Sequence, residues 1–196
     1  MNYVVDDIGT VVAMLRGLDK IKYNLPLYGQ PMLDYLDAQG ATDANIALMP
    51  FYDYGHRREI AQRLTEKDSA DAPFKYQKYP LIALRLDTEE DHSDGVIRYN
   101  LNLAIIASTE VTYSAGQRYE KVFKPVLYPI YEQFLKALGD SGLFWWDANR
   151  DEPPHTKVDR LFWGTAGAEG NESKIFNDNL DAIEILNLRI NQSIKC

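Results

Sequence analysis

Residues 79–108 read YPLIALRLDTEEDHSDGVIRYNLNLAIIAS and hold the clearest fold signal in the chain. In the second half of this stretch, apolar residues alternate with polar residues or alanine. The apolar ones are Ile97, Tyr99, Leu101, Leu103 and Ile105. In the first half, Ile82, Leu84 and Leu86 share a face in the same way. Period-two alternation is typical of antiparallel strands with one face on the core and one in water. The stretch therefore predicts a β-hairpin with residues 87–95 as its acidic connecting tip.

A long amphipathic helix is predicted after the hairpin. Ser114 and Gln117 form a capping-box signature at its start, and Gly139 marks its end. Its apolar stripe is Phe123, Leu127, Ile130, Tyr131, Phe134 and Leu138. Pro125 and Pro129 require a bend or a division into two helices, because an interior proline costs about 3 kcal/mol. The stripe is wider than one sheet face needs, which indicates a second packing partner. The extra apolar residues are Val122, Val126 and Leu135.

The flanking segments complete the predicted fold. Apolar residues spaced by three and four predict a helix over 4–18, followed by an irregular connection over 24–44. Residues 45–54 are predicted as a strand, at an edge because Pro50 cannot donate a ladder hydrogen bond. A short helix is expected over 55–67.

After the long helix the sequence predicts loops and two more strands. A polar stretch over 147–156 precedes a strand over 157–163, and a Gly/Asn/Ser-rich loop over 164–179 precedes a strand over 181–190. Together the elements predict one α+β domain over residues 1–196. Its sheet is mainly antiparallel, with about four to five strands and two main helices on one face.

Composition excludes several classes of protein. The net charge is −8, from 21 basic and 29 acidic residues, which disfavours tight DNA binding because phosphate neutralisation supplies most non-specific affinity. Such a surface would let DNA pass without specific binding. We expect no membrane segment, because no apolar run approaches about 20 residues. The acidic N-terminal sequence is unlike a signal peptide, so folding in a cytoplasm is expected. The single cysteine, Cys196, allows no internal disulfide.

No residue pattern predicts a catalytic, cofactor or metal site. The acidic tip lacks the spacing of a calcium loop, and no two of the three histidines stand at helical metal-ligand spacing. Residues 164–170 are rich in glycine, but the lysine that a phosphate loop requires does not follow them. If the chain is an enzyme, His56 with Asp53 and the acidic tip are its candidates. An ordinary loop-to-helix junction is the favoured interpretation of His56, because proximity in sequence alone is weak support for a catalytic pair.

Aromatic residues point to assembly instead. The chain has 13 tyrosines and three tryptophans, and aromatic residues are enriched at protein interfaces. The adjacent Trp145 and Trp146 would face opposite sides of a strand, so one would meet solvent, a loop or a neighbouring chain. Core packing explains either tryptophan about as well as an interface does. Together with Gly164 and Asn171 of the long loop, they are the candidate assembly contacts.

Three segments carry a resemblance to a known group of proteins. These are FKYQKYPLIAL (residues 74–84), RYE (118–120) and VFKPVLYP (122–129). With the order of elements over about 55–145, they resemble tail-terminator, tail-completion and neck ring proteins of tailed phages. They also look like structural proteins of crAss-like and related Bacteroidetes phages.

The resemblance implies a role in the virion rather than catalysis. It implies a non-catalytic, homo-oligomeric ring at the head–tail connector or tail end, assembled in the bacterial host cytoplasm. Its partners would be the portal, the stopper or the tail tube. The alternatives are a non-viral binding or adaptor module and, less in keeping with the residues, a small hydrolase-type enzyme.

Overall fold

The computed structural model describes residues 3–15, 50–67, 78–145, 155–161 and 178–193. Within these parts five strands form one sheet. The strands are β1 (Phe51–Tyr54), β2 (Leu81–Ser93), β3 (Val96–Ser108), β4 (His155–Val158) and β5 (Leu180–Ser193). Their order is β1-β2-β3-β5-β4, with β1 parallel to β2 and the other neighbours antiparallel. Pro50 directly precedes β1, which lies at a sheet edge as predicted.

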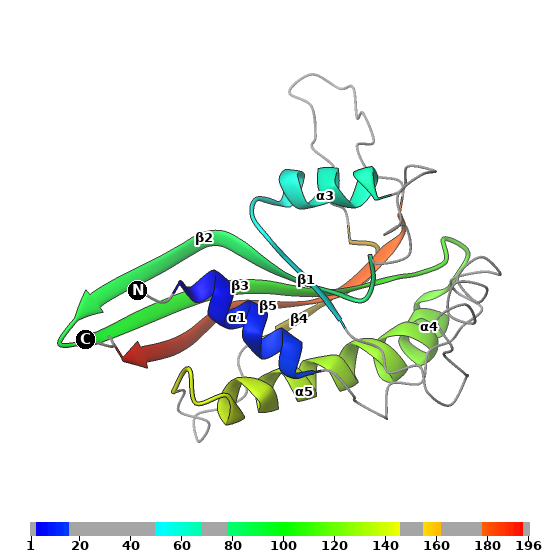
Figure 1. The fold of residues 1–196 in the computed structure, drawn as a ribbon. Coiled ribbons are helices and arrows are strands. Elements are labelled where there is room, and N and C mark those ends of the chain that lie inside the picture. Colours follow the sequence, from blue (N-terminus) through cyan, green and yellow to red (C-terminus); the bar gives the residue numbers. More distant parts are fainter. Residues whose placement is uncertain (1–2, 16–49, 68–77, 146–154, 162–177, 194–196) are drawn as a thin grey trace, which may run out of the picture.

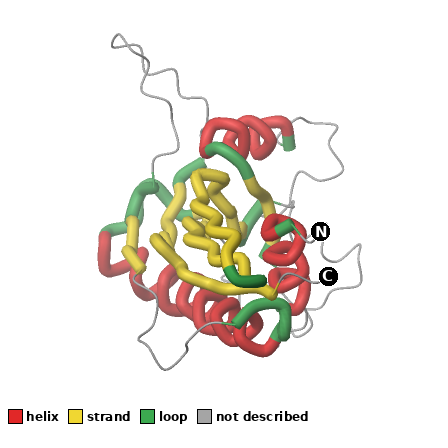
Figure 2. Tube along the Cα trace, turned by 90° about the vertical axis from the view of Figure 1, so that its left-hand side faces the viewer, coloured by secondary structure: helices red, strands yellow, loops and turns green. Residues whose placement is uncertain are grey.

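Helices cover both faces of this sheet. They are α1 (Val4–Met14), α3 (Arg57–Glu66), α4 (Ala115–Arg118), the π-helix η2 (Tyr119–Leu127) and α5 (Tyr128–Asp140). Helices α1 and α5 lie on one side of the sheet and α3 on the other (Figures 1 and 2). The predicted α+β fold with a mostly antiparallel sheet is therefore confirmed. The sequence also predicted the third helix, but not that it covers the opposite face.

The larger core lies between the sheet and α1, η2 and α5. The alternating apolar residues of β3 are all buried in it, as predicted. The opposite face was expected to be in water, and this is wrong for the end of the sheet beneath α3. There Ile60 and Leu64 of α3 form a second core with Ala83, Ala104 and Ile106. Small side chains on the strands let the helix approach closely.

The hairpin turn is tighter than predicted. Strand β2 runs to Ser93 and β3 starts at Val96, so only Asp94 and Gly95 connect them. Both have positive φ, 55° and 74°, which is the conformation of a type I′ turn. Asp-Gly is a strong signal for this turn. The acidic residues before it therefore belong to a strand rather than to a loop.

The sheet is irregular at one level on both sides of β3. Between Arg85 and Glu89, β2 has two more residues than the facing part of β3, and the β3–β5 register also shifts between Leu101 and Leu103. A bulge breaks side-chain alternation and bends the strand. This explains why Leu86, predicted to share the buried face, is 50% exposed.

The helix after the hairpin neither breaks nor simply bends at its prolines. It begins at the predicted capping box, where Ser114 and Gln117 exchange hydrogen bonds of 2.9 and 3.4 Å. It then continues through the nine-residue π-helix η2, which contains Pro125, into α5. A π-helix has a wider turn than an α-helix, and here it includes Pro125, which has no backbone N–H to donate. The helix ends at Asp140, one residue beyond Gly139.

Part of the long helix packs against α1, because α5 contacts α1 and shares one core cluster with it on the same side of the sheet (Figure 1). Leu135 of α5 packs against this cluster. Val122 and Val126 lie instead on η2, which contacts β3 and β5, and are buried in the same cluster. Packing partners for the surplus apolar residues therefore lie within the chain itself.

Strand β4 differs from its prediction. It occupies His155–Val158 rather than residues 157–163, because Arg160 adopts a left-handed φ of 55°. His155 and Thr156, predicted as the end of a loop over 147–156, belong to β4 instead. The rest of that loop, the loop over 24–44 and most of that over 164–179 lie outside the described residues, as do Trp146 and Trp163.

Candidate functional site

The most distinctive feature is a three-stranded projection that we call the arm. It consists of residues 89–100 of the hairpin and 188–193 of β5, beyond the level where the register shifts. Its hairpin end points away from α3 and α4 in Figure 1. One of its faces packs against α1, because Tyr99 and Ile190 are buried in the larger core and Gln192 bonds to Asp7 of α1. Strand β1 pairs with β2 only from Leu81 to Leu84, so no described strand covers the outer edge of β2 along the arm.

Asn102 organises the base of the arm. Its Oδ1 accepts a hydrogen bond of 3.1 Å from the backbone N–H of Asn187, and its Nδ2 donates one of 3.4 Å to the carbonyl oxygen of Asp87. Asn187 has a φ of 58°. Asp87 lies where β2, and Asn187 where β5, has more residues than the facing part of β3. A single side chain thus satisfies backbone groups that both bulges leave without ladder partners.

One face of the arm is a shallow polar groove of about 480 Å³. Two cross-strand rows line it, because the register aligns Glu89 with Asn100 and Arg189, and Asp91 with Arg98 and Asn191. Arg98 pairs with Asp91 at 3.2 Å. This mixture of amides and balanced charges suits a polar contact and supplies no nucleophile with an activating base.

The acidic residues of the predicted tip lie along β2 and are mostly paired. Arg85 contacts Asp87, and His92 Nε2 lies 3.3 Å from a Glu90 carboxylate oxygen. Among the described residues, no group of three or more His, Cys, Asp or Glu side chains is placed to hold a metal ion.

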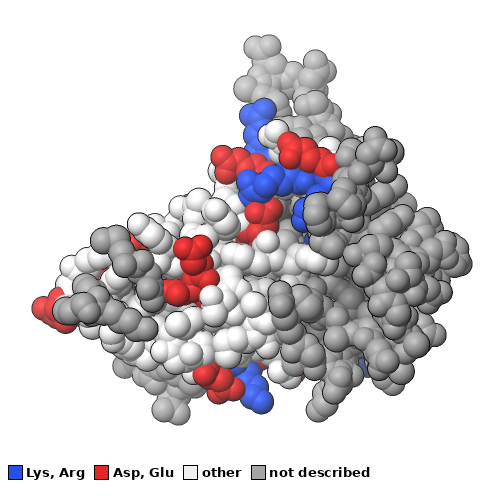
Figure 3. Space-filling model, viewed as in Figure 1, with Lys and Arg blue, Asp and Glu red and all other residues white. Residues whose placement is uncertain are grey.

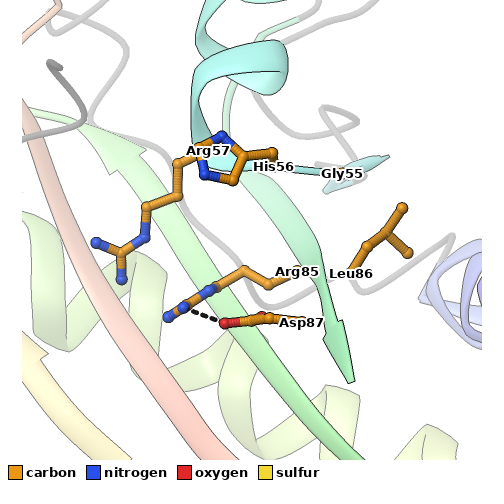
Figure 4. Close-up of a pocket in the computed structure, with 6 residues that line it drawn as sticks. All are labelled: Gly55, His56, Arg57, Arg85, Leu86 and Asp87. Carbon is orange, nitrogen blue, oxygen red and sulfur yellow. Dashed lines mark hydrogen bonds and ion pairs between the residues drawn. The ribbon is translucent and has the colours of Figure 1, made fainter. Parts of the chain in front are cut away.

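A second cavity, of about 420 Å³, lies where β2 starts to bend. Its lining is Gly55, His56, Arg57, Arg85, Leu86 and Asp87 (Figure 4). Arg57 and Arg85 are both bound by carboxylates, since Arg57 Nη2 donates to Glu184 Oε1 at 3.0 Å and Arg85 pairs with Asp87. The side chains here stabilise the junction between α3 and the sheet.

The structure does not bring His56 and Asp53 together as a catalytic pair. His56 is the N-cap of α3: its Nδ1 accepts from the Arg58 backbone N–H at 3.3 Å. Asp53 instead accepts three hydrogen bonds of 2.7 to 3.1 Å from the Arg63 guanidinium. This contact raises the pKa of Arg63 and fixes α3 to β1. Both residues therefore have structural partners.

Of the four candidate assembly contacts, the structure describes only Trp145. Its side chain is 45% exposed, whereas its backbone forms a two-bond bridge with Asn191 of the arm, with N–O distances of 2.9 and 3.0 Å. The preceding Phe144 is buried and contacts the Tyr99 ring edge-on at 6.4 Å. Trp146, Gly164 and Asn171 lie outside the described residues.

Two lysines lie against tyrosine rings, and no local sequence pattern predicts either contact. Lys157 Nζ of β4 lies 5.8 Å from the ring centres of both Tyr119 and Tyr128 on the long helix. Lys121 Nζ lies 4.4 Å from the centre of the Tyr113 ring. The two contacts share no residue, and Tyr119 and Lys121 point to different sides of η2, because residues two apart on a helix do not share a face.

One ion pair of the described residues is fully buried. Arg118 Nη1 donates to Asp181 Oδ1 at 2.7 Å, and the two side chains are 2% and 0% exposed. The same guanidinium donates to the carbonyl oxygens of Glu110 and Tyr113 at 3.0 and 3.1 Å. The contact joins the start of the long helix to β5.

No helix in the described part of the chain is long and apolar enough to cross a membrane. Comparisons of the chain with protein families, with curated proteins and with solved structures found no match.

Proposed function

We propose that this chain is a non-catalytic structural subunit that forms a ring in the virion of a tailed bacteriophage, at the head–tail connector or the tail end. The observation that supports this most is the arm. It is a rigid, bulge-bent extension of the sheet whose outer β2 edge no described strand covers. An open strand edge is a ready site for contact with another chain.

The exposed apolar side chains support the same proposal. Trp145 lies beside the arm, and Tyr54 and Leu86 lie near its base; they are 45%, 46% and 50% exposed. Large exposed aromatic and apolar side chains often act as anchors in protein interfaces. In the proposed ring they meet a neighbouring subunit or another virion protein, such as the portal, the stopper or the tail tube.

Charge supports passage of DNA without specific binding. Acidic side chains lie toward the arm end of the face shown in Figure 3, whereas acidic and basic ones lie together over α3. With a net charge of −8, a ring of such subunits would repel the DNA backbone. We place its assembly in the host cytoplasm.

The test is the mass of the chain in solution, measured by light scattering over a range of concentrations. Electron microscopy of any large species then shows its form. We expect closed rings, or a monomer that forms rings as concentration rises. A chain that stays monomeric throughout and binds no portal, stopper or tail-tube protein contradicts the proposal.

A binding or adaptor module is the second candidate, and the cavity in Figure 4 is the observation that favours it. Arg57, Arg85 and His56 lie at its wall, and an acidic peptide would bind there by displacing Glu184 from Arg57 and Asp87 from Arg85. This function predicts a stable monomer whose peptide affinity falls when Arg57 is replaced by Ala.

A further inference from the structure

The arm has one edge, on β2, that no described strand covers (Figure 1). Pairing of β2 with β1 ends at Leu84. The opposite edge of the arm, on β5, is covered in part, because Asn191 exchanges two backbone hydrogen bonds with Trp145. A strand edge without a neighbour offers its unpaired backbone groups to another chain. The β2 edge is therefore the place where the arm can bind a further strand.

The two-residue turn determines which backbone groups of β2 face this edge. In such a hairpin the residues on either side of the turn, Ser93 and Val96, form a hydrogen-bonded pair. Hydrogen-bonded and non-hydrogen-bonded pairs alternate along antiparallel strands, so His92 and Glu90 belong to non-hydrogen-bonded pairs. The backbone N–H and C=O groups of these two residues therefore point away from β3 and toward the outer edge.

The pairing on the other side of β3 agrees with this assignment. Asn191 of β5 bonds away from β3, so its two neighbours on β5 bond toward it. Their partners on β3 are Ile97 and Tyr99, which also lie opposite His92 and Glu90. Since Ile97 and Tyr99 use their backbone groups on β5, those of His92 and Glu90 remain for the outer edge. Within the described part of the chain, these groups have no backbone partner.

The side chains on this edge are acidic and only partly balanced. Glu89 and Glu90 are exposed, and adjacent residues of a strand point to opposite faces of the sheet. Glu89 has no ion-pair partner among the described residues, since Arg189 in its cross-strand row lies two strands away. Glu90 contacts His92, which is charged only when protonated. A partner strand therefore needs a basic residue on each face, which means two basic residues in succession.

This chain does not contain such a strand. Its only two successive basic residues are Arg57 and Arg58, which begin helix α3. Two copies that pair through their β2 edges would bring two acidic stretches together, and like charges directly opposite each other destabilise a sheet. The occupant that fits the edge is therefore a segment of a different protein.

We propose that the outer edge of β2 along the arm binds an extended segment of another virion protein as an additional strand. The segment carries two successive basic residues among residues that favour strands. Its backbone exchanges hydrogen bonds with Glu90 and His92, and its basic side chains meet Glu89 and Glu90. Backbone bonds supply affinity in this mode of binding, and side chains supply specificity. The inference rests on the proposed function and describes the segment by which a portal, stopper or tail-tube protein is bound.

The test uses the full chain and a synthetic peptide, Thr-Val-Thr-Arg-Lys-Val-Thr-Val, with blocked ends. Titration calorimetry measures its affinity, and hydrogen exchange followed by NMR measures the protection of single backbone amides. We expect saturable binding that slows the exchange of the Glu90 and His92 amides roughly tenfold or more. A peptide with Glu-Glu in place of Arg-Lys should bind roughly tenfold more weakly or less.

A modified peptide tests the backbone hydrogen bonds without any change to the chain. N-methylation of its four central residues removes N–H donors on both of its edges, so binding should weaken roughly tenfold or more. His92→Pro tests the same bonds from the side of the chain, because proline is tolerated in an edge strand where its N–H would face outward. This variant should fold and lose a similar share of the affinity. If it does not fold, the modified peptide alone decides, and undiminished binding of that peptide overturns the proposal.

Charge reversal tests the choice of a basic partner. Glu89→Lys/Glu90→Lys should reverse the preference of the edge, so that the Glu-Glu peptide binds more tightly than the Arg-Lys peptide. Glu132→Lys/Asp140→Lys makes the same charge change at exposed positions of α5 and should bind the Arg-Lys peptide as the wild type does. Thermal unfolding checks that both variants fold. An equal loss of affinity in the two variants reveals only a general effect of net charge and overturns the assigned edge.

The outcomes separate this contact from the ring itself. If the wild-type chain forms rings but the peptide leaves the Glu90 and His92 amides unprotected, the strand contact is overturned and the ring stands. If the peptide protects these amides in a chain that neither forms rings nor binds a virion protein, the edge site stands and the proposed function is overturned. Protection that rises with the concentration of the chain alone would show a second copy at the edge, which overturns the choice of a different protein.

Discussion

At the scale of single residues, a few polar side chains carry the shape of the sheet. Asn102 bonds to the bulged segments of both neighbouring strands, whereas the side chain of Asn100 makes one hydrogen bond within the described part of the chain, of 3.4 Å to Asn187 Oδ1. The Oδ1 of Asn100 is buried without a partner in the described residues. Sequence shows two similar asparagines, and only the structure distinguishes them.

Asn102→Ala should lower the free energy of unfolding by about 1–3 kcal/mol, because backbone groups of both bulges lose a partner. Urea unfolding measures the change. Asn100→Ala is the matched control and should cost clearly less. Equal losses in the two variants would show that the Asn102 side chain does not stabilise the bulges.

Because of the Tyr99 phenol, we expect the folded state to lose stability at alkaline pH. Its OH donates to Gln192 Oε1 at 3.1 Å, and Gln192 Nε2 donates to Asp7 Oδ2 at 2.6 Å. Burial, then Glu90 and Asp7, raise the pKa of Tyr99 to about 12. The folded state thus retains the phenol proton more tightly than the unfolded chain, whose tyrosine pKa is about 10. The stabilisation is complete below pH 10 and is lost as pH rises through 12.

Tyr99→Phe should therefore flatten the fall in stability between pH 10 and 12, measured by urea unfolding at each pH. Some slope should remain, because burial also raises the pKa of Tyr52. Parallel curves for the variant and the wild type would exclude Tyr99 as a source of the pH dependence.

At the scale of elements, the long helix is held at its start by charge and along its length by apolar packing. The buried Arg118–Asp181 pair fixes α4 to β5, and η2 accommodates Pro125 without a break. The capping box and the apolar stripe were readable from sequence because they are local. The π-helix and the ion pair were not, since Asp181 is 63 residues from Arg118.

Arg118→Met should destabilise the fold by about 3–5 kcal/mol, because it leaves the Asp181 carboxylate buried and unpaired. Thermal or urea unfolding measures the loss, and Arg118→Met/Asp181→Leu should recover part of it. Lys124→Met, which breaks an exposed pair with Glu120, is the control and should change stability little. A small loss for Arg118→Met would show that the pair contributes little.

At the scale of the whole molecule, the helices form the core with the sheet, whereas the arm offers an open strand edge. The helices bury the sheet, and the arm extends strands whose outer edge is open for contacts. Adjacent residues next to the arm show this division: Phe144 is 5% exposed and Trp145 is 45% exposed.

On the proposed function, Trp145→Ser should weaken assembly while changing the free energy of unfolding by no more than about 0.5 kcal/mol, because only its backbone bonds to Asn191. Phe144→Ala should instead lower stability by about 3–5 kcal/mol. Sedimentation velocity and urea unfolding measure the two effects. Unchanged assembly in Trp145→Ser would remove this residue from the interface.

The sequence by itself determined the local and periodic features of this protein. Alternation predicted the hairpin and its buried face, and spacing by three and four predicted α1, α3 and the long helix, because periodicity reports which face is buried. The predicted turn is misplaced, because the four acids at 87–91 favour a loop although the Asp94-Gly95 pair marks the turn itself.

Tertiary structure alone decided the rest. It placed α3 on the second face, joined both bulges through Asn102 and placed Lys157 of β4 against Tyr119 and Tyr128 of the long helix. Each of these depends on contacts between segments far apart in the chain, whose register and bulges set the partners. A local pattern carries no information on such partners, because strand pairing is decided by the packing of the whole sheet.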